Sequence, residues 1–222
     1  MEWEHEPARG LRKAGKGAMY VRSIYATGDP AELDGVAEAL RTDGRALLSA
    51  EPGFRGMGLF ADRELGKLLV GSWWEDEASR QASYENLSKR RAEMMAPFAQ
   101  TVTVDNWEAA VARRAEELGP GAGFRLVHMD VEPADIDLLV DTFRDTSLPK
   151  VQKIPGLAGV SLLIDRDRGR AAVGSLYADR DALVASRGAV AAVRGEATAN
   201  ARATTRSLEE FEVVLATAVP HA

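Results

Sequence analysis

The sequence predicts an α+β fold made of two fused ferredoxin-like domains, each with the element order β-α-β-β-α-β. The first observation is the length, because 222 residues accommodate two domains of roughly 100 residues each. The second is that strand-like and helix-like patterns follow the same order in both halves. The third is an internal repeat, in which these motifs lie 103 residues apart: Pro52-Gly53 and Pro155-Gly156, Gly71-Ser72 and Gly174-Ser175, Pro30-Ala31 and Pro133-Ala134.

The first half supplies one complete unit. Residues that are β-branched or aromatic indicate its strands, apolar residues at helical spacing indicate its helices, and Gly, Pro and Asp separate them. Asp29 and Pro30 mark the start of the first helix, and Pro52 marks its end. The expected elements are a strand over 19–26, a helix that begins at 30 and ends before 52, a hairpin of strands over 54–61 and 67–74, a helix from 75 to about 95, and a strand over 101–107.

The second half repeats the unit. Its expected elements are a strand over 124–131, a helix from 133 to about 153, a hairpin of strands over 157–164 and 170–177, an Ala-rich helix over about 179–203, and a strand over 205–216. The domain boundaries follow from these elements and from a Gly- and Pro-containing stretch between them. We expect a flexible tail over 1–17, a first domain over 18–111, a linker over 112–122, a second domain over 123–216 and a short tail over 217–222.

Each predicted sheet carries both of its helices on one face, so its other face would be left uncovered and apolar. The fused second copy can cover that face within the same chain. We therefore expect the two antiparallel sheets to pack face to face as an intrachain pseudo-dimer. A cavity is expected between the sheet and the helices of each half. Further pairing of whole chains into a homodimer is left open.

Composition excludes several classes of protein. A net charge of −6 argues against nucleic-acid binding, which usually requires a basic surface. No apolar stretch is long enough for a membrane span, and the first residues contain no apolar segment of a secretory signal, so a cytoplasmic location is expected. The chain has no cysteine, which excludes disulfides, thiolate nucleophiles and cysteine-ligated metals. Histidines are few and widely spaced, so no metal site is expected.

Arg22 and Arg125 occupy equivalent positions on the first predicted strand of each half. Each shares its strand phase with apolar residues, and a charged side chain on such a face is unfavourable unless it is paired. One interpretation is a structural ion pair or an exposed edge. The other is an anion clamp for a phenolate, an enolate or a carboxylate.

Aromatic residues and one histidine complete the set of candidate substrate contacts. Trp74 and Tyr177 end equivalent strands, where a large ring serves either as core or as the wall of an aromatic pocket. Tyr25 and His128 are also equivalent, and His128 is either a hydrogen-bonded core residue, a general base or an axial heme ligand. Tyr84, on the helix after Trp74, either reaches the pocket mouth or lies on the helix surface. No catalytic residue is assigned.

Three motifs of the first half form a further pattern. Pro-Gly-Phe at 52–54 precedes the second strand, Gly-Ser-Trp-Trp-Glu-Asp-Glu-Ala at 71–78 spans the third strand and the next helix, and Val-Asp-Asn-Trp-Glu at 104–108 lies in the fourth strand. Together these motifs resemble the antibiotic biosynthesis monooxygenase superfamily over most of 18–108, and more weakly over 123–214. The resemblance implies a dimeric α/β barrel of the ferredoxin-like type, here within one chain.

Members of this superfamily include cofactor-free oxygenases that make quinones from polycyclic phenols, and heme-degrading oxygenases. The heme-degrading pattern has a second tryptophan and a histidine after the third strand. Those places hold Ser83 and Glu93 in the first half, and Ser186 and Glu196 in the second. The resemblance therefore implies a small-molecule monooxygenase that oxidises an aromatic or polyketide-like substrate, with no cofactor expected and heme kept as a less favoured alternative.

Two other hypotheses stay open. One is a non-catalytic protein of the same fold that binds a hydrophobic ligand or heme. The other is that one half has lost its pocket and serves as the built-in partner of the other half. The second half is the expected degenerate copy, because it is rich in alanine and has Leu176 in place of Trp73.

Overall fold

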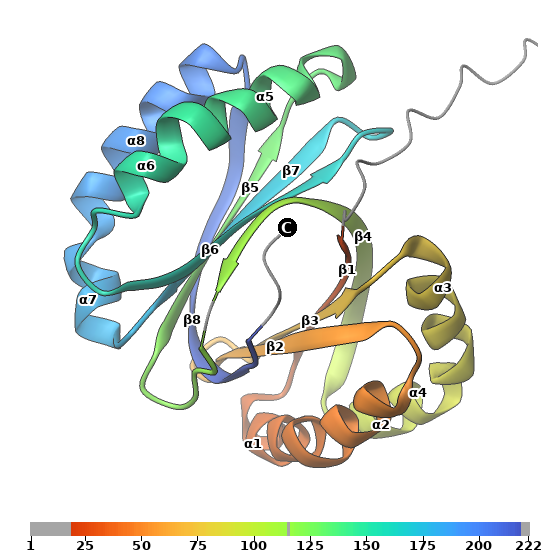
Figure 1. The fold of residues 1–222 in the computed structure, drawn as a ribbon. Coiled ribbons are helices and arrows are strands. Elements are labelled where there is room, and N and C mark those ends of the chain that lie inside the picture. The colour runs from red at the N-terminus through yellow and green to blue at the C-terminus, as the bar shows by residue number, and fades with distance from the viewer. Residues whose placement is uncertain (1–18, 115, 219–222) are drawn as a thin grey trace, which may run out of the picture.

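The computed structural model describes residues 19–114 and 116–218 (Figure 1). The expected tail over 1–17 and residues 219–222 lie outside the described residues. The described chain forms a closed barrel of antiparallel strands, with two groups of helices on opposite sides of it (Figure 1). No helix within the described ranges is long and apolar enough to cross a membrane.

The first half follows the expected order of elements. They are β1 (Met19–Gly28), α1 (Pro30–Ala39), the π-helical segment η1 (Leu40–Gly44), α2 (Arg45–Ala50), β2 (Phe54–Asp62), β3 (Lys67–Trp74), α3 (Glu77–Asn86), α4 (Ser88–Met95) and β4 (Ala99–Arg114). The Asp29 carboxylate caps α1, because it accepts a hydrogen bond from the backbone N–H of Ala31 at 2.9 Å.

The second half repeats this order. Its elements are β5 (Gly123–Asp130), the 3₁₀ turn η2 (Pro133–Asp135), α5 (Ile136–Thr142), the π-helical segment η3 (Phe143–Ser147), α6 (Leu148–Val151), β6 (Leu157–Asp165), β7 (Arg170–Tyr177), α7 (Arg180–Ala185), α8 (Arg187–Asn200) and β8 (Thr204–Ala216). The two π-helical segments start at residues 40 and 143, 103 residues apart. The widened helical turn is therefore part of the repeat, and such turns are frequent at functional sites.

The helices expected to be continuous over 75–95 and 179–203 are each broken in two. A buried serine lies just before or at each break, Ser83 in the first half and Ser186 in the second. Its hydroxyl donates to the backbone carbonyl three residues earlier, at 2.9 Å and 2.7 Å respectively. The backbone hydrogen bonds across the breaks are kept, because the N–H of Leu87 donates to the Ser83 carbonyl and the N–H of Ser186 donates to the Ala182 carbonyl.

The expected face-to-face packing is realised as one closed barrel, with the strand order β1-β3-β2-β8-β5-β7-β6-β4. Between the halves, β2 pairs with β8 and β4 pairs with β6, so the edges of the two sheets are joined by hydrogen bonds. β4 is longer than expected for this reason. It continues through residues 112–114, the first part of the expected linker, where it pairs with 159–161 of β6.

Alternate residues of each strand face the inside of the barrel, here called the lumen, or face the helices. In β1, Val21 belongs to the core of the lumen, whereas Ile24 and Ala26 belong to the core beneath the first-half helices. A third core lies beneath the helices of the second half. The apolar residues thus form three separate cores, and each core contains a cavity.

Gly66 and Gly169 set the turns of the two hairpins, with φ of 59° and 61°. A Cβ at Gly66 would lie 2.3 Å from the carbonyl oxygen of Gly28.

We expect Gly66→Ala to lower the free energy of unfolding by about 1–2 kcal/mol or more, because the strain of the left-handed backbone and the clash of the added Cβ with the Gly28 carbonyl add together. Gly35→Ala is the control, since a Cβ on that exposed glycine of α1 would meet nothing within 4 Å, and it should stabilise slightly. Urea unfolding of both variants checks this, and equal midpoints would contradict it.

Candidate functional site

The first candidate site lies beneath the first-half helices, against the outer face of the sheet. Arg22 of β1 and Trp74 of β3 both lie on this face, and Tyr84 of α3 covers them. The guanidinium carbon of Arg22 is 4.9 Å from the ring centroid of Tyr84 and 5.8 Å from that of Trp74. Arg22 is only 3% exposed and Trp74 is fully buried, so the charge is held among aromatic rings.

Two hydrogen bonds orient Arg22. Its Nη1 donates to Ser83 Oγ at 3.2 Å, and its Nη2 donates to the backbone carbonyl of Arg80. Neither partner is negatively charged, and no carboxylate of the described residues is bonded to Arg22. Burial, with the positive charges of Arg91 and Arg80, lowers the pKa of Arg22 to about 10. Arg22 therefore stays charged at neutral pH and has no counter-ion among the described residues, an unfavourable state that an anion would relieve.

A cavity of about 60 Å³ adjoins Arg22. Leu40 and Gly44 of η1 form part of its wall, together with apolar residues that include Leu48 and Met94. Arg90 and Arg91 also line the cavity, whereas Trp74 and Tyr84 contact Arg22 but are not part of the cavity wall. This volume holds a few water-sized groups rather than a complete ring system. Entry of an aromatic ring therefore requires Leu48 and Met94 to move, and methionine is the side chain that adapts most readily to such a change.

The equivalent arginine of the second half is fully paired. Arg125 is 2% exposed, and its Nη2 and Nε donate to Glu210 Oε1 at 2.8 Å and 3.0 Å. Its Nη1 donates to the Tyr177 hydroxyl at 3.1 Å and to Ser186 Oγ at 3.0 Å. Burial alone would raise the pKa of Glu210, but hydrogen bonds from Arg187 and Arg125 lower it overall. The second half thus contains its own anion.

The strand registers show what differs between the halves. Arg125 lies opposite Glu210 in the β5–β8 pair, and Arg22 lies opposite Asn106 in the β1–β4 pair. A neutral amide therefore replaces the carboxylate at the equivalent place in the first half. The same kind of buried arginine is neutralised in one half and left without an anion in the other.

Tyr25 and His128, proposed from the sequence as substrate contacts together with Arg22 and Arg125, are not in the helix-side pockets with these arginines. Each lies three positions along its strand from its arginine, and this odd offset turns it to the lumen side. The Tyr25 hydroxyl donates to Glu209 at 2.9 Å, and burial together with this bond raises the pKa of Tyr25 to about 12. Lys67 also donates to Glu209, at 2.8 Å, so the contact ties β1 and β3 to β8 of the other half.

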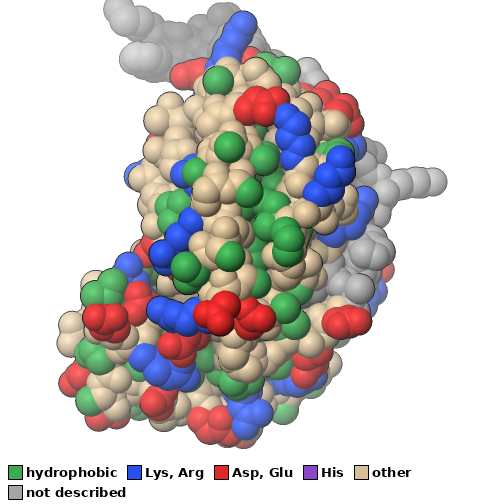
Figure 2. All heavy atoms as spheres, turned by 90° about the vertical axis from the view of Figure 1, so that its left-hand side faces the viewer, with side chains coloured by type: hydrophobic (Ala, Val, Ile, Leu, Met, Phe, Trp, Pro, Cys, Tyr) green, Lys and Arg blue, Asp and Glu red, His purple; other side chains and the backbone are tan. Residues whose placement is uncertain are grey.

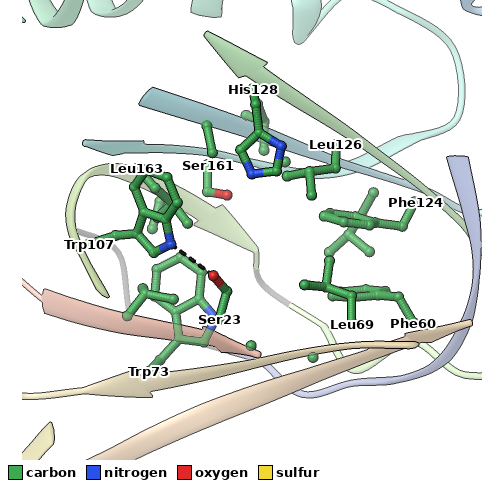
Figure 3. A pocket seen from close by; sticks show the side chains of 18 of the residues that line it. Ser23, Phe60, Leu69, Trp73, Trp107, Phe124, Leu126, His128, Ser161 and Leu163 are labelled. Carbon is green, nitrogen blue, oxygen red and sulfur yellow. Dashed lines mark hydrogen bonds between the residues drawn. The ribbon is translucent and has the colours of Figure 1, made fainter. Parts of the chain in front are cut away.

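The lumen contains a cavity of about 70 Å³ to which both halves contribute (Figure 3). Phe60 and Phe124 stack at one side with ring centroids 3.9 Å apart. On the other side, His128 lies 6.0 Å from Trp107 between ring centroids, and the Trp107 Nε1 donates to Ser23 at 2.9 Å. Burial lowers the pKa of His128, so the imidazole is neutral at pH 7.

The lowered pKa of His128 predicts an acid-sensitive barrel. Because the folded pKa lies below the unfolded value of about 6.5, the stability is fully present above pH 6.5 and is lost as the pH falls below it. We expect the melting temperature to drop between pH 7.5 and pH 5.5, and His128→Gln to reduce that drop. His221→Gln, which replaces a histidine next to the C-terminus, should leave the drop unchanged. Identical pH profiles for wild type and His128→Gln would contradict this assignment.

Heme does not fit the described residues. Neither helix-side cavity has a histidine on its wall, and His128 faces a lumen cavity of about 70 Å³. Pockets for ligands of drug size or larger usually measure about 300–1,000 Å³. No group of three metal-binding side chains occurs within the described part of the chain.

Sequence reasoning did not single out several residues that contact the candidate site. Arg91 lies over the Tyr84 ring at 4.2 Å from its centroid, Ser83 binds Arg22, and Glu210 binds Arg125. A signal for the first two was present, because Ser83 and Ser186, and likewise Arg91 and Arg194, are 103 residues apart. No such signal marked Glu210, because Asn106 and Glu210 are 104 residues apart.

Two ferredoxin-like units closed into one barrel, with a buried arginine beside two aromatic rings beneath the helices of the first unit, define a tandem dimeric α/β-barrel protein. The family model described as antibiotic biosynthesis monooxygenase matches residues 19–88. Residues 19–88 thus form an antibiotic biosynthesis monooxygenase domain, as the sequence resemblance predicted.

Relatives and solved structures agree with this assignment of the fold. Two uncharacterized proteins of Mycobacterium tuberculosis are similar in sequence. Rv2558 is 27% identical, and the match covers 93% of this chain and 88% of Rv2558. Rv2557 is 28% identical, and the match covers 76% of this chain and 75% of Rv2557. A "putative monooxygenase" from Lactobacillus acidophilus has a TM-score of 0.70 at 14% identity, with 92% of this chain and 99% of that chain covered. An anthrone oxidase-like protein has a TM-score of 0.64 at 13% identity, with 92% and 93% covered. A heme-degrading enzyme from Listeria monocytogenes has a TM-score of 0.50 at 10% identity, with 87% and 98% covered.

Proposed function

We propose that the protein is a small-molecule monooxygenase that oxidises an aromatic or polyketide-like substrate in the first-half cavity without a resident cofactor. The observation that carries this proposal is the buried Arg22, which lies beside Trp74 and Tyr84 and bonds to no described carboxylate. A phenol or an enol can bind there as its oxyanion, because none of the described carboxylates neutralises the guanidinium. The family match and the fold shared with an anthrone oxidase-like protein support the reaction class.

The proposed reaction uses the substrate and dioxygen. Arg22 stabilises the substrate oxyanion, which lowers the pKa of the substrate and lets its proton leave to solvent. The anion gives one electron to dioxygen, and the substrate radical and superoxide then combine to form a carbon–oxygen bond. The resulting peroxide takes up a proton and loses water, which leaves a new carbonyl. One oxygen atom enters the product and the other leaves as water.

Trp74 and Tyr84 contribute by excluding water from the anion. An oxyanion that has lost its hydration shell is a better electron donor, provided that a fixed cation holds it. Trp74 is fully buried and Tyr84 is half-buried, so these rings limit the access of water to Arg22, which supplies the cation.

Oxygen uptake with a panel of single-ring and fused-ring phenols and enols tests the proposal. We expect Arg22→Gln to lower kcat/KM by about 100-fold, because it removes the charge that stabilises the reacting anion. Arg41→Gln is the control, since Arg41 is exposed and paired with Glu38. Labelled dioxygen should place one oxygen atom in the product. Wild-type turnover by Arg22→Gln on a verified substrate would exclude this site.

A non-catalytic ligand-binding protein is the second candidate. The observation in its favour is that no described carboxylate is bonded to Arg22 and no histidine lines this cavity, so no side chain is placed there to act as a base. Saturable binding of the panel without oxygen uptake would favour this candidate over the oxygenase.

A further inference from the structure

The cavity beneath the second-half helices is built differently from its counterpart. It measures about 60 Å³ and lies between the outer face of the sheet and η3 and α8. Its wall is mainly apolar, with Val127, Phe143 and Val190 among its members. Arg125 also reaches this cavity, but its guanidinium is already bonded to Glu210, as described above. The buried cation therefore offers no free charge to a ligand.

Ser147 provides an unpaired hydroxyl on the wall of this cavity, which Ser175 and Thr198 also line. It is the last residue of η3, it is 3% exposed, and its Oγ has no hydrogen-bond partner among the described residues. A buried hydroxyl without a partner is unfavourable, so a ligand that offers an acceptor oxygen would gain from filling the place. The first half has Gly44 at the equivalent position, on the wall of its own cavity. The hydroxyl is therefore specific to the second half.

The outer surface over this cavity has exposed apolar side chains. Figure 2 looks onto this side of the molecule and shows hydrophobic side chains along the middle of the face, with Lys and Arg on both sides. Leu138, Val184 and Leu208 are the exposed large apolar residues of the second half, each more than 40% exposed. Arg194 lies on the cavity wall and is half-buried, so its guanidinium keeps contact with water. Because water screens its charge, Arg194 favours an anionic ligand over an uncharged one only weakly.

We propose that the second-half cavity is a separate site for an uncharged, apolar ligand that carries one hydrogen-bond acceptor oxygen. Ser147 donates a hydrogen bond to that oxygen, and the apolar wall contacts the body of the ligand. Glu210 makes the site selective for uncharged ligands, because it already forms an ion pair with Arg125, the cation that an anionic ligand would need. The two cavities then prefer ligands of different charge, although they arise from one repeated unit. This second site does not depend on the proposed oxygenase activity.

Two probes of the same shape and different charge test the proposal. Benzoate is an anion at neutral pH, and nitrobenzene is its uncharged counterpart with acceptor oxygens. The cavity of about 60 Å³ is smaller than either ring, so binding of either probe requires the apolar wall to move, as in the first half. Backbone amide shifts of Ser147 and Val190 report the second cavity, and those of Gly44 and Leu87 report the first. We expect nitrobenzene to shift the second-cavity signals in the wild-type protein at concentrations where benzoate does not.

Two substitutions separate the parts of the argument. Ser147→Ala should weaken nitrobenzene binding about fivefold, the loss expected for one hydrogen bond. Glu210→Gln should leave nitrobenzene binding in place and add benzoate binding at the second cavity, because Arg125 is then free. Glu212→Gln is the matched control, since Glu212 also lies on β8 but pairs with Arg63 and Arg180 instead.

Benzoate binding at the second cavity of the wild-type protein, equal to that of nitrobenzene, would overturn the proposal. So would the absence of any nitrobenzene shift at Ser147 and Val190, or unchanged nitrobenzene affinity in a folded Ser147→Ala protein. Failure of the oxygenase proposal would appear separately, in oxygen uptake and in the signals of the first cavity.

Discussion

Replacing Arg125 with leucine is expected to lower the free energy of unfolding by about 3 kcal/mol. The same replacement at Arg22 should either lower this free energy by no more than about 1 kcal/mol or raise it. Removal of Arg125 leaves Glu210, which is 19% exposed, with only Arg187 as a partner. Removal of Arg22 leaves no described carboxylate unpaired, and it eliminates a buried charge that no carboxylate in the described part of the chain neutralises. The two substitutions are chemically identical and occupy equivalent strand positions.

Urea unfolding followed by circular dichroism measures both effects. Arg125→Leu should shift the midpoint strongly to lower urea, and Arg22→Leu should not. If the protein needs Arg22 only to bind an anion, Arg22→Leu should lose ligand binding while it keeps or gains stability. A large loss of stability in Arg22→Leu would mean that the Arg22 bonds to Ser83 and Arg80 are structural, and the site would lose its main argument.

Replacing Trp74 with alanine is expected to lower the free energy of unfolding by about 3–5 kcal/mol, the usual range for a buried tryptophan. Trp74 is fully buried, packs edge-on against Phe54 at 5.6 Å between ring centroids, and donates from Nε1 to Ser72 Oγ at 3.0 Å. The same change removes the ring beside Arg22, so ligand binding at the first cavity should also be lost.

Trp74→Phe separates the two roles. It keeps an aromatic ring in the core, so it should be clearly more stable than Trp74→Ala while it loses the Nε1 bond to Ser72. Leu65→Ala is the control for a surface site, because Leu65 is 61% exposed and should change stability by less than about 0.5 kcal/mol. If Trp74→Ala unfolds at the same urea concentration as Leu65→Ala, the packing assigned to Trp74 is wrong.

The repeat made the architecture predictable. Turn glycines fix the hairpins, so strands β3 and β7 begin and end at the expected residues, 67–74 and 170–177. The joining of the two sheets was less accessible, because the pairing of β4 with β6 is a contact between distant segments that no local pattern records. The helix interruptions were also missed, because no proline lies within 75–95 or 179–203 to mark them.

The candidate site could be predicted only in part. Strand alternation was enough to place Arg22 and Trp74 on one face, and the same rule places Tyr25 and His128 on the other. The charge balance was not accessible, because β8 contains one extra residue, Arg206, at a bulge in its pairing with β5 that the β1–β4 pair lacks at the equivalent place. A fixed spacing of 103 residues aligns Glu210 with Trp107, whereas the strand register aligns it with Asn106. Only the paired strands reveal that Arg125 has a carboxylate and Arg22 has an amide.

The joining of both units in one chain has an evolutionary consequence. In a barrel assembled from two identical chains, every substitution appears twice, so a carboxylate that closes one pocket closes the other as well. Here Asn106 and Glu210 are encoded separately, and each pocket can change while the other is preserved. The partner unit is also always present at a high effective concentration, so barrel closure does not depend on how much protein the cell contains. Covalent duplication thus frees one pocket to diverge while the other keeps its chemistry.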